Sequence, residues 1–180
     1  VLDPNRKKMS KSKGNVVVPN DLIEQYGADA VRYWSANARL GADTANDEQV
    51  FKVGKKLVVK IFNASKFVLN NFHKIDVLDK SNIKNPLDKS LVFIFNNYLE
   101  KITESLNKYQ FAEALNLTED FFWNYFTDNY IELVKNRRLN GSSADSLSAS
   151  TTLILILENV LKLFAPFVPM ITDEIWLTMY

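Results

Sequence analysis

The segment that most constrains the fold lies near the end of the chain, where apolar residues surround an expected helix instead of lining one side of it. Residues 147–164 contain two apolar series at helical spacing. A helix that is apolar over so much of its circumference belongs inside a group of other helices. The sequence therefore predicts a helical bundle with this segment at its centre. The two series are Leu147, Ile154, Leu157, Leu161 and Phe164, and Leu153, Ile156, Val160 and Leu163.

Three further segments have the pattern expected of helices that pack around a core. In residues 50–72 the apolar positions recur at steps of three and four, and residues 87–108 repeat this spacing. Residues 111–139 are also expected to be helical, with most of their aromatic rings in the core. The predicted fold is mainly α: a small α-rich module over residues 1–46, then an antiparallel helical bundle over residues 47–180. The apolar stripe of residues 50–72 consists of Val50, Val53, Leu57, Ile61, Ala64, Val68 and Phe72.

Local signals suggest where several elements begin and end. Val16–Val18 could form one short strand, and Asp29 is expected to cap the helix that follows it. Five serines between Ser142 and Ser150 predict a loop and possible helix caps. Thr172, which is followed by two acidic residues, is expected to cap a last helix. Because the chain opens on Val1 and stops soon after that helix begins, both ends suggest a piece of a longer protein.

Composition excludes several classes of site. The chain has 180 residues, no cysteine and a single histidine, His73. Disulfide scaffolds, thiolate metal sites and cysteine nucleophiles are therefore excluded, and neither a metal site nor a serine–histidine–aspartate triad is expected. We expect His73 to be a solvated or capping residue. The apolar stretch of residues 153–171 contains Glu158, Lys162 and two prolines, so no membrane span is expected.

Charge is unevenly distributed along the chain. Residues 1–75 carry 13 Lys and Arg against 7 Asp and Glu, whereas residues 76–180 carry 9 against 14. A net charge of +1 for the whole chain conceals this difference. The asymmetry suggests that the first part faces a polyanion while the rest is a solvated scaffold.

The densest group of cations is residues 6–15, Arg-Lys-Lys-Met-Ser-Lys-Ser-Lys-Gly-Asn. This segment has no apolar period and is expected to form a loop. Lysines supply point charges, hydroxyl and backbone N–H groups supply donors, and Gly14 permits a close approach of the backbone. Such a loop suits a polyphosphate, although a solvated basic loop or a nucleic-acid contact also fits the composition.

Within this loop, Lys8-Met9-Ser10-Lys11-Ser12 matches in full the KMSKS signature of class I aminoacyl-tRNA synthetases. The residues that follow match as well, among them Gly14-Asn15 and Tyr26-Gly27-Ala28-Asp29-Ala30-Val31-Arg32. With this signature and its ordered context, the chain resembles the class Ia branch of that family.

Within class Ia the sequence is most similar to the valyl enzymes. The likeness runs from Ala38–Thr44 to Asp173–Trp176, and with the loop it covers essentially the whole chain. Lys13, Asn46 and Asn136 depart from the family's usual residues. The last two differences keep isoleucyl and leucyl enzymes open as alternatives.

The resemblance implies an enzyme that attaches valine to its tRNA, with ATP and Mg²⁺ as substrate. In the family, this loop closes over ATP while the amino acid's carboxylate attacks the α-phosphate. By resemblance, Lys11 stabilises charge on the departing pyrophosphate and Lys8 supports it. Met9, Ser10 and Ser12 complete the implied ATP-binding set.

The family's second signature, His-x-Gly-His, is absent because His73 is the only histidine. The resemblance therefore implies that the nucleotide-binding fold lies upstream, and that this piece alone does not aminoacylate. For the full-length enzyme, a monomer in the cytoplasm is expected.

The resemblance also implies an RNA-facing side. Residues 1–46 would contact the tRNA stem, and the bundle over residues 47–180 would be the anticodon-binding domain for valine isoacceptors. Among the candidate contacts, the lysines could also form an ordinary solvated helix face, and Arg137 and Arg138 could simply complement the dipole of their helix. The candidate tRNA contacts are Arg39, Lys52, Lys56, Lys135, Arg137 and Arg138.

Two other functions remain open from the sequence. One is a stand-alone RNA-binding helical bundle whose lysine loop is structural. The other is a helical protein–protein adaptor, which would show no salt-dependent binding of tRNA.

Overall fold

The computed structural model describes residues 1–70 and 78–180. Phe72, expected in the first apolar stripe, and His73, expected to be solvated or capping, both lie outside these residues.

All regular elements in the described ranges are helical, which confirms the mainly α fold. The β-type pairing there consists of two isolated bridges that Leu2 makes to Lys8 and to Ala45. Val16–Val18 forms no strand. The elements in chain order are η1 (Lys11–Lys13), α1 (Pro19–Tyr26), α2 (Ala28–Ala36), α3 (Glu48–Leu69), η2 (Lys80–Asn82), α4 (Pro86–Asn107), α5 (Phe111–Asp120), η3 (Phe121–Tyr130), α6 (Ile131–Asn140), α7 (Ser143–Phe164) and α8 (Pro169–Met179).

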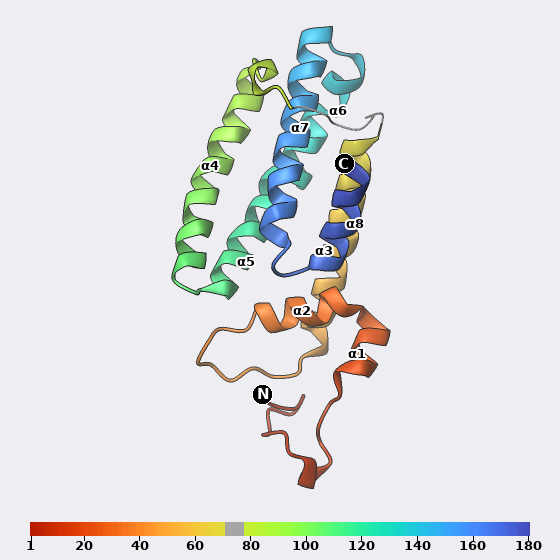
Figure 1. The fold of residues 1–180 in the computed structure, drawn as a ribbon, viewed down its shortest axis with the longest axis vertical. Helices are drawn as coiled ribbons and strands as arrows, with labels where there is room; N and C mark the ends of the chain where they lie inside the picture. The colour runs from red at the N-terminus through yellow and green to blue at the C-terminus, as the bar shows by residue number, and fades with distance from the viewer. Residues whose placement is uncertain (71–77) are drawn as a thin grey trace.

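The long helices lie side by side as an antiparallel bundle (Figure 1). Helices α3, α5 to α6, and α8 run in one direction, while α4 and α7 run in the other. At one end of this bundle lie α1 and α2, and the N-terminal loop extends away beyond them. The molecule is therefore a bundle with a small helical module at one end.

Helix α7 supplies the centre of the core. Every residue from Ser148 to Leu157 is buried, and so are Val160, Leu161 and Phe164 further along. By length and composition alone α7 is apolar enough to cross a membrane, but most of its apolar window is buried inside the bundle, as in a core helix. The prediction of an enclosed apolar helix is confirmed.

The predicted start of α7 is wrong. Residues 143–150 are helical instead of forming a loop, and Ser142, one of the serines expected as possible caps, is the N-cap of the helix. Its Oγ accepts a hydrogen bond from the backbone N–H of Asp145 at 3.3 Å. Leu147 is 49% exposed, so it does not belong to the core.

The apolar stripe of α3 is shifted at its beginning. Phe51 and Gly54 face the interior there, whereas Val53, which the spacing places in the stripe, is exposed. From Leu57 to Val68 the expected positions are buried.

The shift occurs because α1 and α2 pack against the first turns of α3. The ring of Phe51 stacks on Tyr26 with 5.5 Å between centroids and lies equally close to Trp34. A Cβ on Gly54 would lie 2.8 Å from Cδ1 of Tyr33. Glycine at this position therefore lets α2 cross α3 closely.

Residues 111–140 form one continuous helical rod, in which η3 has the wider π-helical geometry. Phe121, Phe122, Phe126 and Tyr130 are buried, while Tyr125 remains partly exposed. The predicted helix and the core role of most of its aromatic rings are confirmed.

A polar contact fastens the N-terminal module to the bundle. The carboxylate of Asp29 accepts two backbone N–H groups in the first turn of α8, at 2.8 and 3.1 Å. Arg32 donates to the carbonyl of Pro166 at 2.9 Å. Asp29 therefore caps α8 and not its own helix, and Thr172, expected to be that cap, lies inside α8.

Candidate functional site

The basic loop is held at its base by two polar side chains. Nδ2 of Asn15 donates to Oδ2 of Asp3 at 2.9 Å, and Oδ1 of Asn15 accepts the backbone N–H of Ser10 at 2.9 Å. Asp3 also accepts the backbone N–H of Lys7 at 2.8 Å. Through Leu2, the same stretch of chain is hydrogen-bonded to residues 44 and 46. Both ends of the loop are thus fixed to the module while its middle projects outward.

The predicted ATP-binding residues lie on this projecting part. Lys8, Lys11 and Ser12 are exposed, and Met9 and Ser10 are half-buried. The hydroxyl oxygens of Ser10 and Ser12 lie 3.2 Å apart. The loop therefore presents two cations and a pair of hydroxyl groups on the same short segment, which is the chemistry that binds a phosphate chain.

The base of the loop is stabilised by an ionised carboxylate. Asp3 is only 6% exposed. Its hydrogen bond from Asn15 and the backbone N–H of Lys7 lower its pKa below the ordinary value, because both favour the carboxylate. Gly14 ends the short η1 turn in the left-handed region, with φ of 65°. These contacts preorganise the loop without using its lysine ammonium groups.

A second group of cations lies along one face of α3. Lys52, Lys55, Lys56 and Lys60 line a groove of about 740 Å³, which Trp123 also lines. We call this surface the α3 groove. The Nζ of Lys60 lies 5.0 Å from the centroid of the Trp123 ring. The groove therefore combines cations with an aromatic surface.

Some of these lysines already have acidic partners. Lys52 pairs with Glu48 at 2.8 Å, which lowers the pKa of that carboxyl group, and Lys60 pairs with Asp128 at 2.8 Å. Lys56 makes no ion pair within the described part of the chain. Exposed pairs of this kind contribute little, so the groove can exchange these partners for phosphates.

The other two exposed cations of the candidate set lie apart from the α3 groove. Arg39, in the connection after α2, lines a separate cleft beside the turn between α4 and α5. Lys135 is on α6, 3.6 Å from Glu132, and α6 lies at the end of the bundle away from the module (Figure 1). The structure therefore does not gather all the candidate RNA contacts on one surface.

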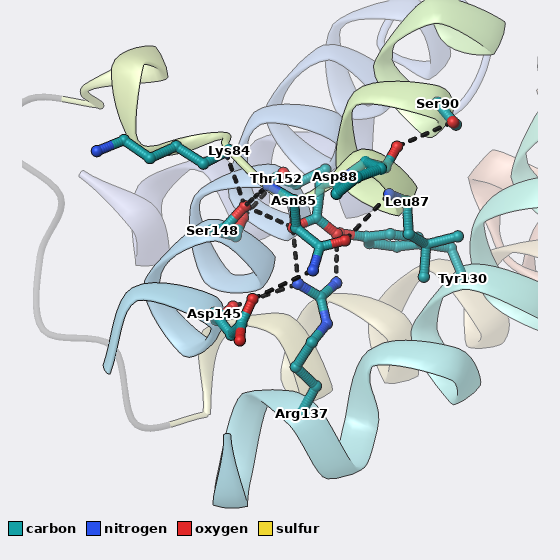
Figure 2. Close-up of polar contacts among 11 residues, drawn as sticks. Lys84, Asn85, Leu87, Asp88, Ser90, Tyr130, Arg137, Asp145, Ser148 and Thr152 are labelled. Atoms are coloured by element: carbon teal, nitrogen blue, oxygen red, sulfur yellow. Dashed lines mark hydrogen bonds and ion pairs between the residues drawn. The ribbon is translucent and has the colours of Figure 1, made fainter. Parts of the chain in front are cut away.

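Arg137, a candidate tRNA contact, points into the bundle (Figure 2). Its guanidinium donates to both carboxylate oxygens of Asp88, with Nη1 at 2.9 Å from Oδ2. Asp88 is fully buried, and it also accepts the hydroxyl groups of Tyr130 at 2.7 Å and Ser148 at 2.6 Å. The carboxylate raises the pKa of Arg137. This network joins α4, η3, α6 and α7.

Arg138 is also engaged inside the molecule. Its guanidinium donates to the carbonyls of Phe67 at 2.8 Å, Val68 at 2.9 Å and Asn70 at 2.6 Å. It thereby satisfies carbonyls at the end of α3, where a cation also complements the helix dipole. The guanidinium groups of Arg137 and Arg138 are thus committed to contacts within the fold, and their direct contact with tRNA stays a prediction.

Sequence reasoning missed the roles of Asp3, Asn15 and Asp88. Asn15 was visible as the last residue of the Gly-Asn pair, but its partner Asp3 lies 12 positions earlier, with no pattern to connect the two. Asp88 follows Pro86 in the first turn of α4 and has the sequence pattern of an ordinary N-terminal acid. Among the described residues, no group of His, Asp and Glu side chains is placed to hold a metal ion.

Two family models match the chain on either side of α3. Residues 88–180 match the anticodon-binding domain of tRNA ligase, and residues 1–47 match tRNA synthetases class I (I, L, M and V). Because the first match covers more than half of the chain, the chain belongs to the family of anticodon-binding domains of tRNA ligases. This confirms the class that the KMSKS signature indicates.

The chain is also similar along its whole length to valine–tRNA ligases. The enzyme from Thermobifida fusca (strain YX) is 46% identical over 176 residues, which cover 98% of this chain and 20% of that protein. The enzyme from Rickettsia felis is 45% identical over 190 residues, which cover 99% of this chain and 22% of that protein. The chain therefore spans about a fifth of the length of these curated relatives.

Two solved structures share the fold. A LeuRS from Agrobacterium radiobacter, in a ternary complex with tRNA and LeuAMS, has a TM-score of 0.70 at 20% identity, covering 98% of this chain and 21% of that one. Mycobacterium tuberculosis methionyl-tRNA synthetase, in complex with methionyl-adenylate, has a TM-score of 0.69 at 21% identity, covering 97% of this chain and 36% of that one. At this identity the likeness concerns the fold alone.

Proposed function

We propose that the protein carrying this chain is a valine–tRNA ligase, which uses ATP to attach valine to its tRNA. The observation that carries the proposal is the complete Lys8–Ser12 signature on a loop whose base is fixed by Asp3 and Asn15. The identity of about 45% to valine–tRNA ligases along the whole chain supports it. The expected partners are valine isoacceptor tRNAs, and the expected location is the cytoplasm, with the enzyme a monomer.

In the proposed reaction, the loop acts on the phosphates of ATP. As the carboxylate of valine attacks the α-phosphate, negative charge grows on the departing pyrophosphate. Lys11 would meet this charge and Lys8 would support it, which lowers the barrier if the contact is stronger in the transition state than with bound ATP. Met9, Ser10 and Ser12 would complete the ATP site, and Mg²⁺ would enter bound to ATP.

The rest of the chain would bind tRNA. We assign residues 1–46 to the loop and stem-contact module, and residues 47–180 to the anticodon-binding bundle. Lys52 and Lys56 of the α3 groove, together with Arg39 and Lys135, are the proposed contacts to the RNA backbone. Arg137 and Arg138 would act indirectly, by holding the helices that present these cations.

The catalytic role of Lys11 is testable in the full-length enzyme. Lys11→Ala should raise the barrier to adenylate formation by about 2–4 kcal/mol, while tRNA affinity changes little. Lys13→Ala is the matched control, since it removes an equally exposed charge from the same loop outside the signature. Pre-steady-state ATP–pyrophosphate exchange measures the rate of adenylate formation for both variants. A loss below tenfold for Lys11→Ala, or equal losses for both variants, would refute the assigned role.

A further inference from the structure

The turn between α4 and α5 contains a tyrosine in a backbone conformation that usually requires glycine. Tyr109 has φ of 57°. The N–H of Gln110 donates to the carbonyl of Ser105 at 2.8 Å, and the N–H of Tyr109 donates to that of Leu106 at 2.9 Å. These two bonds define a Schellman ending, in which the left-handed position is most often glycine. A bulky side chain in this conformation is strained, and such strain suggests a functional role for the side chain.

The ring of Tyr109 does not serve the core. Tyr109 is 70% exposed, and its ring meets only that of Phe111 edge to face among the described residues, with centroids 6.2 Å apart. The strained backbone therefore holds an aromatic surface out toward solvent. Tyrosine can provide such a surface at low cost in conformational entropy, since its ring is placed by two torsions.

Tyr109 and Phe111 line a cleft of about 720 Å³, within the size range of small-ligand sites. Arg39 lines the same cleft from the connection after α2, which lies at the same end of the bundle as the α4–α5 turn (Figure 1). The structure shows no ion pair for Arg39 among the described residues. An aromatic ring and an uncommitted guanidinium thus share one cleft.

The other charges in this cleft balance, since two lysines face two glutamates. Lys101 lies against the ring of Tyr98, with Nζ 5.8 Å from its centroid, and Lys108 pairs with Glu104. Glu113 also lines the cleft. The net positive charge of this cleft is small, so charge alone would not make it an anion-binding site. It instead fits a ligand that has both a flat ring and one phosphate.

We propose that this cleft binds an unpaired nucleotide of RNA, whose base stacks on Tyr109 and whose phosphate faces Arg39. Stacking of a base on an exposed aromatic ring is sequence-tolerant and is compatible with a neighbouring cation. The site rests on the proposed function, since it assumes that the protein binds tRNA. It adds a stacking contact that is separate from both the lysine loop and the α3 groove.

Replacing Tyr109 by glycine separates binding from stability. Tyr109→Gly removes the ring and relieves the strained φ, so the protein should melt at the parental temperature or somewhat higher. Its affinity for tRNA should nevertheless fall roughly 5- to 150-fold, the range expected for a lost base stack. Tyr109→Trp, which keeps a flat ring, should bind within a few-fold of the parent. Phe93→Ala is the matched control, because Phe93 is a similarly exposed ring on α4 outside the cleft.

The titration is performed with the full-length protein and valine tRNA at fixed salt, together with melting curves for each variant. If Tyr109→Gly binds like the parent, the stacking site is refuted while the proposed function stands. If Tyr109→Trp loses as much affinity as Tyr109→Gly, stacking is likewise refuted. If the parent itself does not bind tRNA, the proposed function fails, and the inference fails with it.

Discussion

At the residue scale, the contrast between Arg137 and Lys135 shows how burial changes the role of a cation. Both lie on α6 within two positions of each other. Lys135 is exposed beside Glu132, whereas Arg137 reaches the fully buried carboxylate of Asp88. A buried carboxylate that loses its cation is left uncompensated in a medium of low dielectric constant, so the two positions should respond very differently to substitution.

Arg137→Ala should therefore lower the free energy of unfolding by about 3 kcal/mol, while Lys135→Ala should lower it by less than about 1 kcal/mol. Replacing both partners, as Asp88→Leu with Arg137→Met, should recover part of the loss because no charge is left buried. Urea-induced unfolding measures these differences.

The same double variant separates structure from recognition. When folded, Asp88→Leu with Arg137→Met should bind tRNA as the parent does, since Arg137 acts within the bundle. A selective loss of tRNA affinity in a stably folded double variant would restore Arg137 as an RNA contact.

At the scale of the element, α3 has one face in the core and another in solution. Leu57, Ile61 and Val68 are fully buried, while Lys52 and Lys56 line the α3 groove on the outside. If the outer face follows an RNA backbone, each lysine that meets a phosphate releases counterions. The salt dependence of binding then measures how many of these contacts form.

Lys52→Ala with Lys56→Ala should weaken tRNA binding and reduce the slope of log affinity against log salt by roughly 1.5–2. Lys80→Ala with Lys84→Ala removes the same charge from positions outside the groove and serves as the control. Titration at two or more salt concentrations measures the slopes. Equal effects of the two double variants would mean nonspecific attraction of a polyanion, and not a groove that follows the RNA.

How far the sequence predicts these elements depends on where their determinants lie. The interior helix, the aromatic rod and most of the α3 stripe follow from local apolar spacing. The register at Phe51 and Gly54 depends on α1 and α2 crossing α3, which local spacing does not encode. The cap of α8 comes from Asp29, far earlier in the chain, so Thr172 is a reasonable local choice that tertiary contact overrides.

In the candidate site, too, the features that local sequence determines are predictable and those that depend on tertiary contacts are not. The signature at residues 8–12 is contiguous, so sequence alone is enough to propose it as the ATP-binding loop. The clamp between Asp3 and Asn15, the buried partner of Arg137 and the strained Tyr109 depend on spatial neighbours or on backbone conformation, and no pattern in the sequence marks them. Arg137 and Arg138 show the converse, because adjacent cations at a helix end suggest an exposed pair, whereas in the structure both guanidinium groups bond within the fold.

At the scale of the whole molecule, the loop and the bundle are parts of one arrangement. The loop lies beyond one end of the bundle (Figure 1). Asp29 and Arg32 of the module bond to the start of α8 and to the α7–α8 turn. A tRNA held along the bundle would therefore be held in a defined relation to the nucleotide loop. The chain spans about a fifth of the length of its curated relatives.

The most direct test of the proposed function is the amino acid that the full-length protein activates. Aminoacylation of unfractionated tRNA should be measured with valine, isoleucine and leucine in parallel, at matched concentrations. We predict that valine is attached to tRNA with the highest kcat/KM of the three. Preferential attachment of isoleucine or leucine would contradict the valine assignment, and failure to charge tRNA with any of the three would contradict the proposed ligase activity.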